Sequence, residues 1–167
     1  CGNGSTYWAD PFRREVVDYN VSIAEEAARM GFDEIQFDYI RFPPACVSEE
    51  RLEHARYAMV STTTSRVAAI ADFLAEARRR LRPLGVAIAV DTFGWTLLRG
   101  DDMYIGQHME TMAQYVDYIC PMVYPSTWED GALGLDYPPA HPYELIYRSL
   151  TGGMARLRDM PGVRIRP

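Results

Sequence analysis

The chain has 167 residues, 48% of them hydrophobic and 24% charged, which is the composition of one folded domain and argues against disorder. Its formal net charge of −6 gives no electrostatic reason to expect nucleic acid or an anionic membrane as a partner. No apolar run approaches the roughly 20 residues of a membrane span. No signal peptide is visible, and the start at Cys1 is compatible with a piece of a longer protein.

Cysteine and histidine show no metal-site pattern. The residues concerned are Cys1, Cys46 and Cys120, and His54, His108 and His141. No CxxC pair occurs, so free thiols are expected, and the histidine spacing favours core or surface roles over metal ligation. A phosphate-cradling glycine loop and a GxSxG nucleophile elbow are both missing from the sequence. We therefore expect no cofactor and no metal.

The first predicted element is a helix that begins at Asp10-Pro11 and ends before Gly31. Asp10 suits an N-cap, Pro11 suits the first helical position, and Gly31 suits the C-terminal cap. Apolar residues at three- and four-residue steps predict one buried stripe, formed by Phe12, Val16, Tyr19, Ile23, Ala27 and Met30.

The helix leads into the stretch from Gly31 to Pro43, which predicts a buried strand with a carboxylate at its C-terminal end. Alternation places Glu34, Gln36 and Asp38 on one face. The other face takes Ile35, Phe37 and Tyr39. A parallel strand covered by helices is normally apolar on both faces, so this polar face is expected to line a site.

A second pair of elements is predicted after the proline pair Pro43-Pro44. A short helix is expected near 49–57, and the Ser/Thr run 61–65 caps a longer helix that Pro83 and Gly85 end. The stripe of this longer helix is Val67, Ile70, Leu74, Ala77 and Leu81. The arginine run 78–80 in its last turn suits the helix dipole and is interpreted as a solvated helix end.

Residues 86–90 predict a second strand, with Ala87, Ala89 and Asp91 on one face, and residues 91–95 are expected to turn out of the sheet. A helix is predicted after Asp101-Asp102, with the stripe Ile105, His108, Met109, Met112 and Val116. Residues 118–124 predict a third strand whose pairing is irregular at Pro121. A long loop, 125–141, precedes a helix that starts at Pro142, with Gly152-Gly153 as the expected point of any break, and 163–165 begin a fourth strand.

This order of elements predicts an α/β fold. Strands separated by helices imply right-handed crossovers and a parallel sheet, either open and doubly wound or closed into a (β/α)8 TIM barrel. Strands that are polar on one side favour the barrel, because its inward faces line a site at the C-terminal mouth. A whole barrel needs roughly 250 residues, so residues 1–167 are expected to form a single partial TIM-barrel domain with about four strands.

Asp38 and Asp91 are the predicted catalytic pair. Both are expected at C-terminal strand ends on the faces assigned inward. Glycoside hydrolysis needs at least two facing carboxyl groups, one as the acid and the other as the base or nucleophile. Asp38 is expected to be the nucleophile or general base and Asp91 the acid, with exchanged roles left open. The alternatives are an ion pair of Asp38 with Arg41 and a turn-capping role for Asp91.

Other polar and aromatic residues are predicted to position the substrate. Gln36 would orient Asp38, Arg41 would hold Asp38 ionised or grip a sugar hydroxyl, and Tyr124 would donate a hydrogen bond. Loop rings suited to sugar faces are Trp95 and Trp128, and spare acid candidates are Glu129 and Asp130. Packing and subunit contacts are the plainer alternatives for these aromatic residues.

Several motifs resemble one family. They are Trp8-Ala9-Asp10-Pro11, Asp18-Tyr19-Asn20, the stretch 31–43, Asp91-Thr92-Phe93-Gly94 and Pro121-Met122-Val123-Tyr124-Pro125-Ser126. Together they resemble the bacterial putative glycosyl hydrolase domain of unassigned specificity, a TIM-barrel relative of known glycosidases. The resemblance implies the middle of a barrel, from the loop after the third strand to the start of the seventh. It also implies a polysaccharide or oligosaccharide substrate and favours an extracytoplasmic location.

A weaker similarity links the chain to chitinase-like glycosidases, whose fourth strand carries spaced aspartates and a catalytic glutamate. Asp33 and Asp38 match two of those aspartates, Gln36 replaces the middle one, and Ile40 stands in the place of the glutamate. The substrate-assisted mechanism of those enzymes is therefore not transferred.

Two other functions stay open at this point. The domain could be a non-catalytic barrel that binds glycan or a cell-wall partner. It could also be an open α/β enzyme of other chemistry, if Gln36 and Asp38 face helices.

Overall fold

The computed structural model describes residues 8–43 and 57–167. Its helices are α1 (Arg14–Arg29), α3 (Thr63–Leu81), α4 (Met109–Met112) and α5 (Pro142–Arg156). Its strands are β1 (Glu34–Phe37), β2 (Ala87–Phe93), β3 (Tyr118–Met122) and β4 (Arg164–Ile165). Short 3-10 turns lie at Arg82–Leu84, Gly94–Leu97, Pro125–Thr127, Ala132–Gly134 and Pro138–Ala140. The short helix predicted near 49–57 falls almost wholly outside the described residues.

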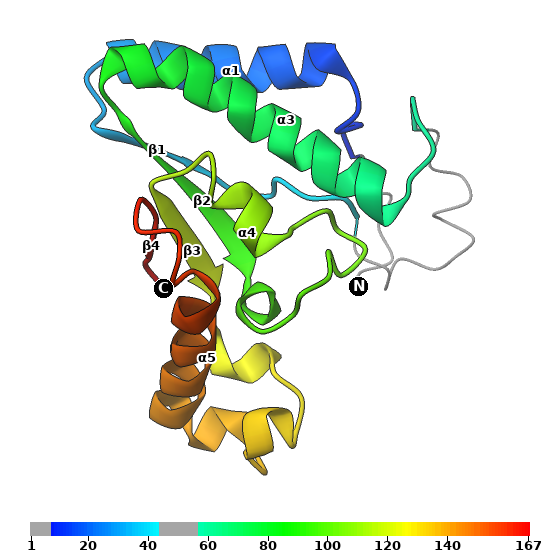
Figure 1. The fold of residues 1–167 in the computed structure, drawn as a ribbon, viewed down its shortest axis with the longest axis vertical. Helices are drawn as coiled ribbons and strands as arrows, with labels where there is room; N and C mark the ends of the chain where they lie inside the picture. Colours follow the sequence, from blue (N-terminus) through cyan, green and yellow to red (C-terminus); the bar gives the residue numbers. More distant parts are fainter. Residues whose placement is uncertain (1–7, 44–56) are drawn as a thin grey trace.

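All four strands are parallel and lie in one sheet in the order β1-β2-β3-β4. Figure 1 shows α1 and α3 side by side at one end of the molecule and α5 at the other. The parallel sheet confirms the predicted α/β class. Strand alternation puts Ile35, Phe37, Ile88, Val90 and Ile119 on the face that packs against the helices, where they form the core with the buried helix residues.

The opposite face of the sheet carries polar side chains, as the alternation of the first strand predicted. Gln36 and Asp38 are exposed there, and Glu34 is half-buried. Within the described part of the chain, the contacts of this face are made with other strand residues and with Arg166, which follows β4. A doubly wound sheet would place helices on this side, so the arrangement agrees with a segment of a barrel.

Arg166, which follows β4, spans the polar face of the sheet as far as β1. Neighbouring strands lie about 4.8 Å apart, so β1 and β4 would be about 14 Å apart across a flat sheet. The Arg166 side chain meets the side chains of Glu34 and Gln36 of β1 across this face. Side chains that extend toward one another therefore connect the two edge strands.

Helix α1 differs from its prediction in two ways. It begins at Arg14, because Asp10 instead caps a separate turn by accepting the backbone N–H of Phe12 at 3.0 Å. The predicted stripe is also wrong in part, since Tyr19 is 69% and Met30 74% exposed. The residues that are buried are Val17, Val21, Ala24 and Ala28. Two sets of apolar residues in this helix have helical spacing, and the set with the smaller side chains packs against the rest of the domain.

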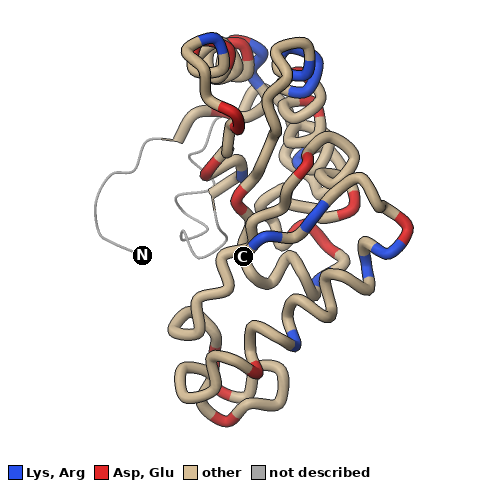
Figure 2. The backbone as a smooth tube through the Cα atoms, turned by 90° about the vertical axis from the view of Figure 1, so that its left-hand side faces the viewer, with Lys and Arg blue, Asp and Glu red and all other residues tan. Residues whose placement is uncertain are grey.

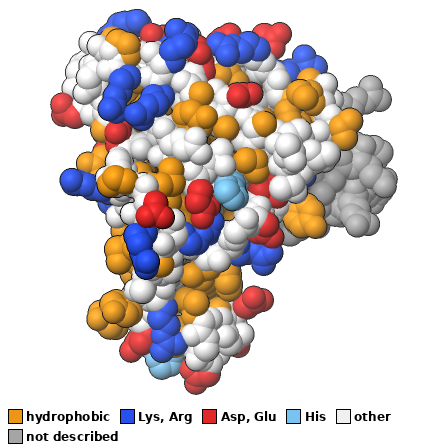
Figure 3. Space-filling view, in the orientation of Figure 1, with side chains coloured by type: hydrophobic (Ala, Val, Ile, Leu, Met, Phe, Trp, Pro, Cys, Tyr) orange, Lys and Arg blue, Asp and Glu red, His pale blue; other side chains and the backbone are white. Residues whose placement is uncertain are grey.

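Helix α3 confirms its predicted start and most of its predicted stripe, since Ile70, Leu74, Ala77 and Leu81 are buried and Val67 is half-buried. Thr62 accepts a bond from the Ser65 N–H at 3.1 Å, and the Ser65 hydroxyl accepts one from the Thr62 N–H at 2.8 Å, which forms a reciprocal cap. The arginine run at its end makes structural contacts. Arg80 pairs with Glu25 of α1, and Arg78 donates to the Tyr115 carbonyl at 3.2 Å. Figures 2 and 3 show basic and acidic residues interspersed at this end of the molecule.

Two other predicted helices have different lengths. The helix predicted after Asp101-Asp102 is a single turn, α4, because Met103, Tyr104 and Gly106 adopt positive φ angles that break helical geometry. Helix α5 continues through Gly152-Gly153 without a break. A Cβ on Gly153 would lie 2.5 Å from the Leu97 Cδ2 atom, so these glycines let α5 approach the turn after β2 closely.

Strands β2 and β3 also end at different places from those predicted. β2 runs on to Phe93, so Asp91 lies inside the strand and not at its end. β3 ends at Met122. The carbonyls of Asp117 and Ile119 accept bonds from β4 and Arg166, whereas Pro121, next along that edge, has no N–H to donate. Pairing of β3 with β2 nevertheless continues in register through Pro121 to Met122, so no irregularity appears on that side.

No helix among the described residues is long and apolar enough to cross a membrane.

Candidate active site

The two predicted catalytic carboxylates lie on neighbouring parallel strands near the C-terminal edge of the sheet. β1 and β2 pair through Phe37 and Val90, so one further step along the register sets Asp38 against Asp91. Paired positions of neighbouring strands are about 4.8 Å apart. Asp38 lies just past the end of β1 and is exposed, whereas Asp91 is half-buried within β2.

Gln36 connects these strands. Its Nε2 atom donates to Asp91 Oδ1 at 2.6 Å, so the bond goes to Asp91 and not to Asp38, the predicted partner. An amide N–H that meets a carboxylate oxygen at this distance is a charge-assisted hydrogen bond. Gln36 therefore holds one oxygen of Asp91 in place, and the other carboxylate oxygen is left to other contacts.

Opposing effects set the protonation of Asp91. Its partial burial is the largest effect and raises the pKa of the carboxyl group, and the negative charge of Asp38 raises it further. The hydrogen bond from Gln36 and the positive charge of Arg166 act in the opposite direction. The net result is a raised pKa. Asp91 thus favours its protonated form more than an ordinary aspartate does.

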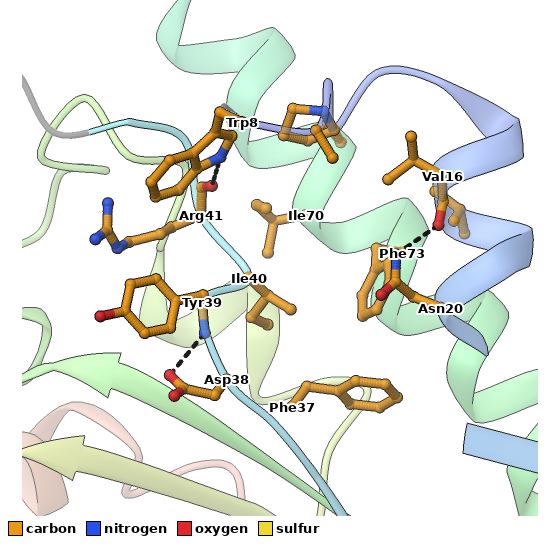
Figure 4. A pocket seen from close by; sticks show the side chains of 14 residues that line it. Trp8, Val16, Asn20, Phe37, Asp38, Tyr39, Ile40, Arg41, Ile70 and Phe73 are labelled. Atoms are coloured by element: carbon orange, nitrogen blue, oxygen red, sulfur yellow. Dashed lines mark hydrogen bonds between the residues drawn. The ribbon is translucent and has the colours of Figure 1, made fainter. Parts of the chain in front are cut away.

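Asp38 is held by a local turn. Its Oδ1 atom accepts the backbone N–H of Tyr39 at 2.7 Å, and Tyr39 has a left-handed φ of 55°. This conformation ends the strand and reverses the expected alternation, so Tyr39 is exposed instead of buried. Figure 4 shows the Asp38 and Phe37 side chains directed to opposite sides of the chain.

Arg41 lies among aromatic rings. Its guanidinium carbon is 4.7 Å from the ring centroid of Trp8, 5.1 Å from that of Tyr39 and 5.0 Å from that of Phe93. The Trp8 indole N–H also donates to the Arg41 carbonyl at 3.0 Å (Figure 4). Cation–π contacts contribute about 0.5–2 kcal/mol each. They tie the segment after β1 to the N-terminal segment and to the end of β2.

The two predicted tryptophan platforms contact each other. Trp95 and Trp128 have ring centroids 4.3 Å apart at an interplanar angle of 31°. Trp128 is only 5% exposed, so its ring has little face to offer a sugar, whereas Trp95 is half-buried. A Cβ on Gly94 would lie 2.9 Å from the Met122 carbonyl, so glycine is needed where the turn after β2 passes the end of β3. Tyr124, just past β3, is 56% exposed.

Gln107 was not identified from the sequence, yet it supports the site. It is 1% exposed, its Nε2 donates to the Asp91 carbonyl at 3.2 Å, and its Oε1 accepts the Phe93 N–H at 3.0 Å. It therefore occupies the hydrogen-bonding groups of β2 beyond the point where β1 ends. A glutamine between the predicted stripe residues Ile105 and His108 was the available signal, since a buried amide needs partners.

Arg166 was also not identified from the sequence as part of the group of polar residues near Asp91. Arg166 binds Glu34, with Nη1 to Oε2 at 3.0 Å, and its Nη2 donates to Gln36 Oε1 at 3.2 Å. It also lies 3.6 Å from Cys120 Sγ. Burial is the largest effect on the pKa of the Cys120 thiol and raises it. Extending the predicted fourth strand by one residue would have put Arg164 and Arg166 on one face.

A separate cavity of about 470 Å³ lies between the start of α1, α3 and residues 37–41. Its lining is largely apolar and includes Val16, Phe37, Ile70 and Phe73 (Figure 4). Asp38 and Arg41 stand at its border. The cavity is on the helix side of β1, away from the Gln36–Asp91 bond, so it does not bring the two predicted catalytic carboxylates together.

Among residues 8–43 and 57–167, no group of three or more His, Cys, Asp or Glu side chains could hold a metal ion.

Several solved glycoside hydrolase structures resemble this fold at low identity. The glycoside hydrolase domain of PgaB (BpsB) from Bordetella bronchiseptica has 16% identity and a TM-score of 0.62, with 96% of this chain and 50% of that chain covered. The spore cortex-lytic enzyme SleL of Bacillus megaterium QM B1551 has 14% identity and a TM-score of 0.58, with coverage of 99% and 33%.

A group IV chitinase of Ostrinia furnacalis, solved with allosamidin, has 14% identity and a TM-score of 0.55, with coverage of 93% and 40%. The chain thus spans about a third to a half of these structures, and the likeness shows a shared fold, that of a glycoside hydrolase TIM barrel in part. The search of curated proteins found no match. The sequence profile of one family, described as the putative glycosyl hydrolase domain, matches residues 2–167, and the chain therefore belongs to that family.

Proposed function

We propose that this domain hydrolyses glycosidic bonds of a polysaccharide or oligosaccharide with Asp91 as the general acid and Asp38 as the general base or nucleophile. Family membership supports a general glycosidase role. The observation that carries the residue assignment is the Gln36–Asp91 hydrogen bond of 2.6 Å beside Asp38 at the C-terminal edge of the sheet. That edge is where barrel enzymes keep their active sites.

The assignment of roles follows from the raised pKa of Asp91. A general acid must hold a proton at the working pH, and burial together with the charge of Asp38 favours the protonated carboxyl of Asp91. Asp38 is more exposed and accepts only a backbone N–H in the bonds described above. It is therefore the better candidate to attack the anomeric carbon directly or to take a proton from the water that attacks it.

In this proposal the other predicted residues position the substrate. Tyr124 offers an exposed phenol near the end of β3, and Trp95 offers part of a ring supported by Trp128. Arg41 anchors the segment that follows Asp38 through its aromatic contacts. The separation of the carboxylates decides between retention and inversion, at about 5–5.5 Å for retaining and about 6.5–9.5 Å for inverting enzymes.

The test is glycan hydrolysis by the full-length protein and its variants. A panel of polysaccharides and oligosaccharides is screened by the release of reducing ends. Asp38→Asn and Asp91→Asn should each lower kcat by about 100- to 10,000-fold on any substrate found, because each removes a group that transfers a proton or attacks. Asp159→Asn, at an exposed position in the turn after α5, is the matched control and should retain wild-type rates.

Thermal melts accompany the assays, and Asp38→Asn should melt close to the wild-type temperature. Wild-type rates for Asp38→Asn or Asp91→Asn would refute the residue assignment. Glycan binding without hydrolysis by the wild-type protein would support the non-catalytic barrel instead.

A further inference from the structure

Arg166 extends over the polar face of the sheet to meet side chains of β1. It follows β4, yet its guanidinium binds Glu34 and Gln36 on the opposite edge strand. The residues of β2 that pair with these two positions are Ala87 and Ala89. Their small side chains leave room for the arginine to pass over β2.

The guanidinium is held from two sides. Glu34 forms an ion pair with it through both carboxylate oxygens. The ring of Tyr118 on β3 lies beneath it, with the guanidinium carbon 4.5 Å from the ring centroid. A planar group with one bidentate carboxylate partner and one ring face in contact has few alternative orientations. Arg166 is thus a fixed donor on this face.

The contact with Gln36 determines which end of the amide faces Asp91. A glutamine amide has an acceptor end and a donor end, and either end can point toward a carboxyl group. Arg166 has only donors, so it can bind only Oε1 of Gln36, which it does at 3.2 Å. Nε2 is then turned toward Asp91 Oδ1, which it meets at 2.6 Å.

We propose that Arg166 is a positioning residue that acts through Gln36 to orient the Asp91 carboxyl group. The expected effect on catalysis rests on the proposed function of Asp91 as general acid, whereas the orientation of the Asp91 carboxyl group by Arg166 does not. Glu34 keeps the guanidinium in place, and the alanines of β2 keep its path open. Hydrogen bonds connect Glu34, Arg166, Gln36 and Asp91 in that order, from β1 to the residue after β4, back to β1 and on to β2.

Charged and titratable groups approach Asp91 from each element around it. Asp38 and Glu34 come from β1, Cys120 from β3, and Arg166 from the residue after β4. Arg166 and Gln36 both lower the pKa of Asp91 against the effects of burial and Asp38. Loss of Arg166 should therefore raise this pKa, both by removing a positive charge and by freeing the Gln36 amide to turn.

The experiment compares Arg166→Gln and Arg166→Lys with Arg164→Gln in the full-length protein. Arg164 is the matched control because it is an exposed arginine of β4 two residues earlier and on the same face. The first readout is the titration of the Asp91 carboxyl carbon by NMR with labelled aspartate, assigned with Asp91→Asn. The second readout is the pH profile of kcat and KM on a substrate from the glycan screen.

For Arg166→Gln we expect a raised Asp91 pKa, the basic limb of the kcat profile displaced to higher pH because Asp91 is the general acid, and kcat lowered by roughly 10- to 100-fold. KM should change little. Arg166→Lys keeps a charge but loses the planar fork, so its shift should have the same direction and a smaller size. In a Gln36→Ala background, loss of Arg166 should lower kcat much less than in the wild type, because the two residues act together.

An Asp91 titration that is unchanged in both Arg166 variants would overturn the inference, as would full additivity with Gln36→Ala. An equal shift in Arg164→Gln would also overturn it, because a general charge effect would then suffice. A wild-type protein that hydrolyses no glycan would refute the proposed function, and the NMR titration would still decide whether Arg166 orients Asp91.

Discussion

Replacing Asp102 by alanine is expected to destabilise the domain more than any other single loss of a surface or loop carboxylate described above. Asp102 and Arg66 form a bidentate pair, with Nε to Oδ2 at 2.7 Å and Nη2 to Oδ1 at 3.2 Å. Their side chains are only 4% and 8% exposed. The Asp102 carboxylate also accepts the backbone N–H groups of Tyr104 and Gly106, each at 3.2 Å.

The size of the effect follows from what the substitution leaves behind. Removing one partner of a buried pair costs about 3–5 kcal/mol, because the other charge remains buried. Arg66 keeps weaker contacts with the hydroxyl oxygens of Ser61 and Thr63, which offset part of this cost, while two backbone donors lose their acceptor. We therefore expect a loss of about 3–5 kcal/mol, or roughly 6–20 °C in Tm for a domain of this size.

The assay is urea unfolding together with thermal denaturation followed by circular dichroism. Asp101→Ala is the matched control, because Asp101 is the neighbouring residue and its pair with Arg99 is about half exposed. Such a surface pair contributes at most about 1 kcal/mol. The double variant Arg66→Met/Asp102→Ala should be more stable than the sum of the single losses predicts, by about 0.5–3 kcal/mol. A loss below about 1 kcal/mol in Asp102→Ala would refute the reasoning.

Other predictions test the backbone and the carboxylates. Gly106→Ala should cost more than Gly85→Ala: both have positive φ, but only at Gly106 would a Cβ meet a backbone oxygen, at 2.9 Å, so urea unfolding should separate them by about 1 kcal/mol or more. Arginine hydrogen bonds lower the pKa of Glu76 from its usual 4.5 to about 2. The ionised Glu76 therefore stabilises the fold fully above pH 4.5, and this contribution is lost as the pH falls toward 2. In Glu76→Gln the free energy of unfolding should depend less on pH between 4.5 and 2 than in the wild type. The pKa of Asp91 is raised, so its ionisation lowers the stability of the fold as the pH rises. Asp91→Asn should therefore raise Tm above that of the wild type at pH 7 but not at pH 3, and an equal change in Tm at both pH values would contradict this.

The strands could be predicted from the sequence better than the helix faces. Alternation assigned residues 34–37 to the correct faces, because Glu34 and Gln36 are too polar to pack against helices, but it was wrong at Tyr39, which is exposed. The stripe of α1 was wrong because Val17 and Val21 share helical spacing with the larger residues that turned out exposed. Which of two stripes is buried depends on the neighbouring helix, and periodicity within one helix carries no information about that neighbour.

The sequence names Asp38 and Asp91 as candidates but not the residues that connect them. Asp38 could be chosen because a strand end is recognisable from a local pattern, whereas Asp91 lies inside β2 and not at its end. Gln107 and Arg166 could not be chosen, since their partners are 16 and 130 residues away in the chain. The short length of α4 was not predicted either. The left-handed conformations that precede it include Met103 and Tyr104, whereas glycine is the residue that usually indicates such a conformation in a sequence.

The Gln107 side chain has a consequence for how the loop after β1 can vary. Its amide gives one hydrogen bond to the Asp91 carbonyl and takes one from the Phe93 N–H, the two bonds that the peptide group of a further β1 residue would make in a parallel ladder. Gln107 thus acts as a substitute peptide unit supplied by a different segment. The backbone of Asp91 is thereby held by the segment that carries Gln107, and the Phe42 N–H holds that segment in turn by donating to the Ile105 carbonyl at 2.8 Å. We therefore expect changes of length after Phe42 to leave the Asp91 backbone in place more readily than changes between Phe37 and Phe42.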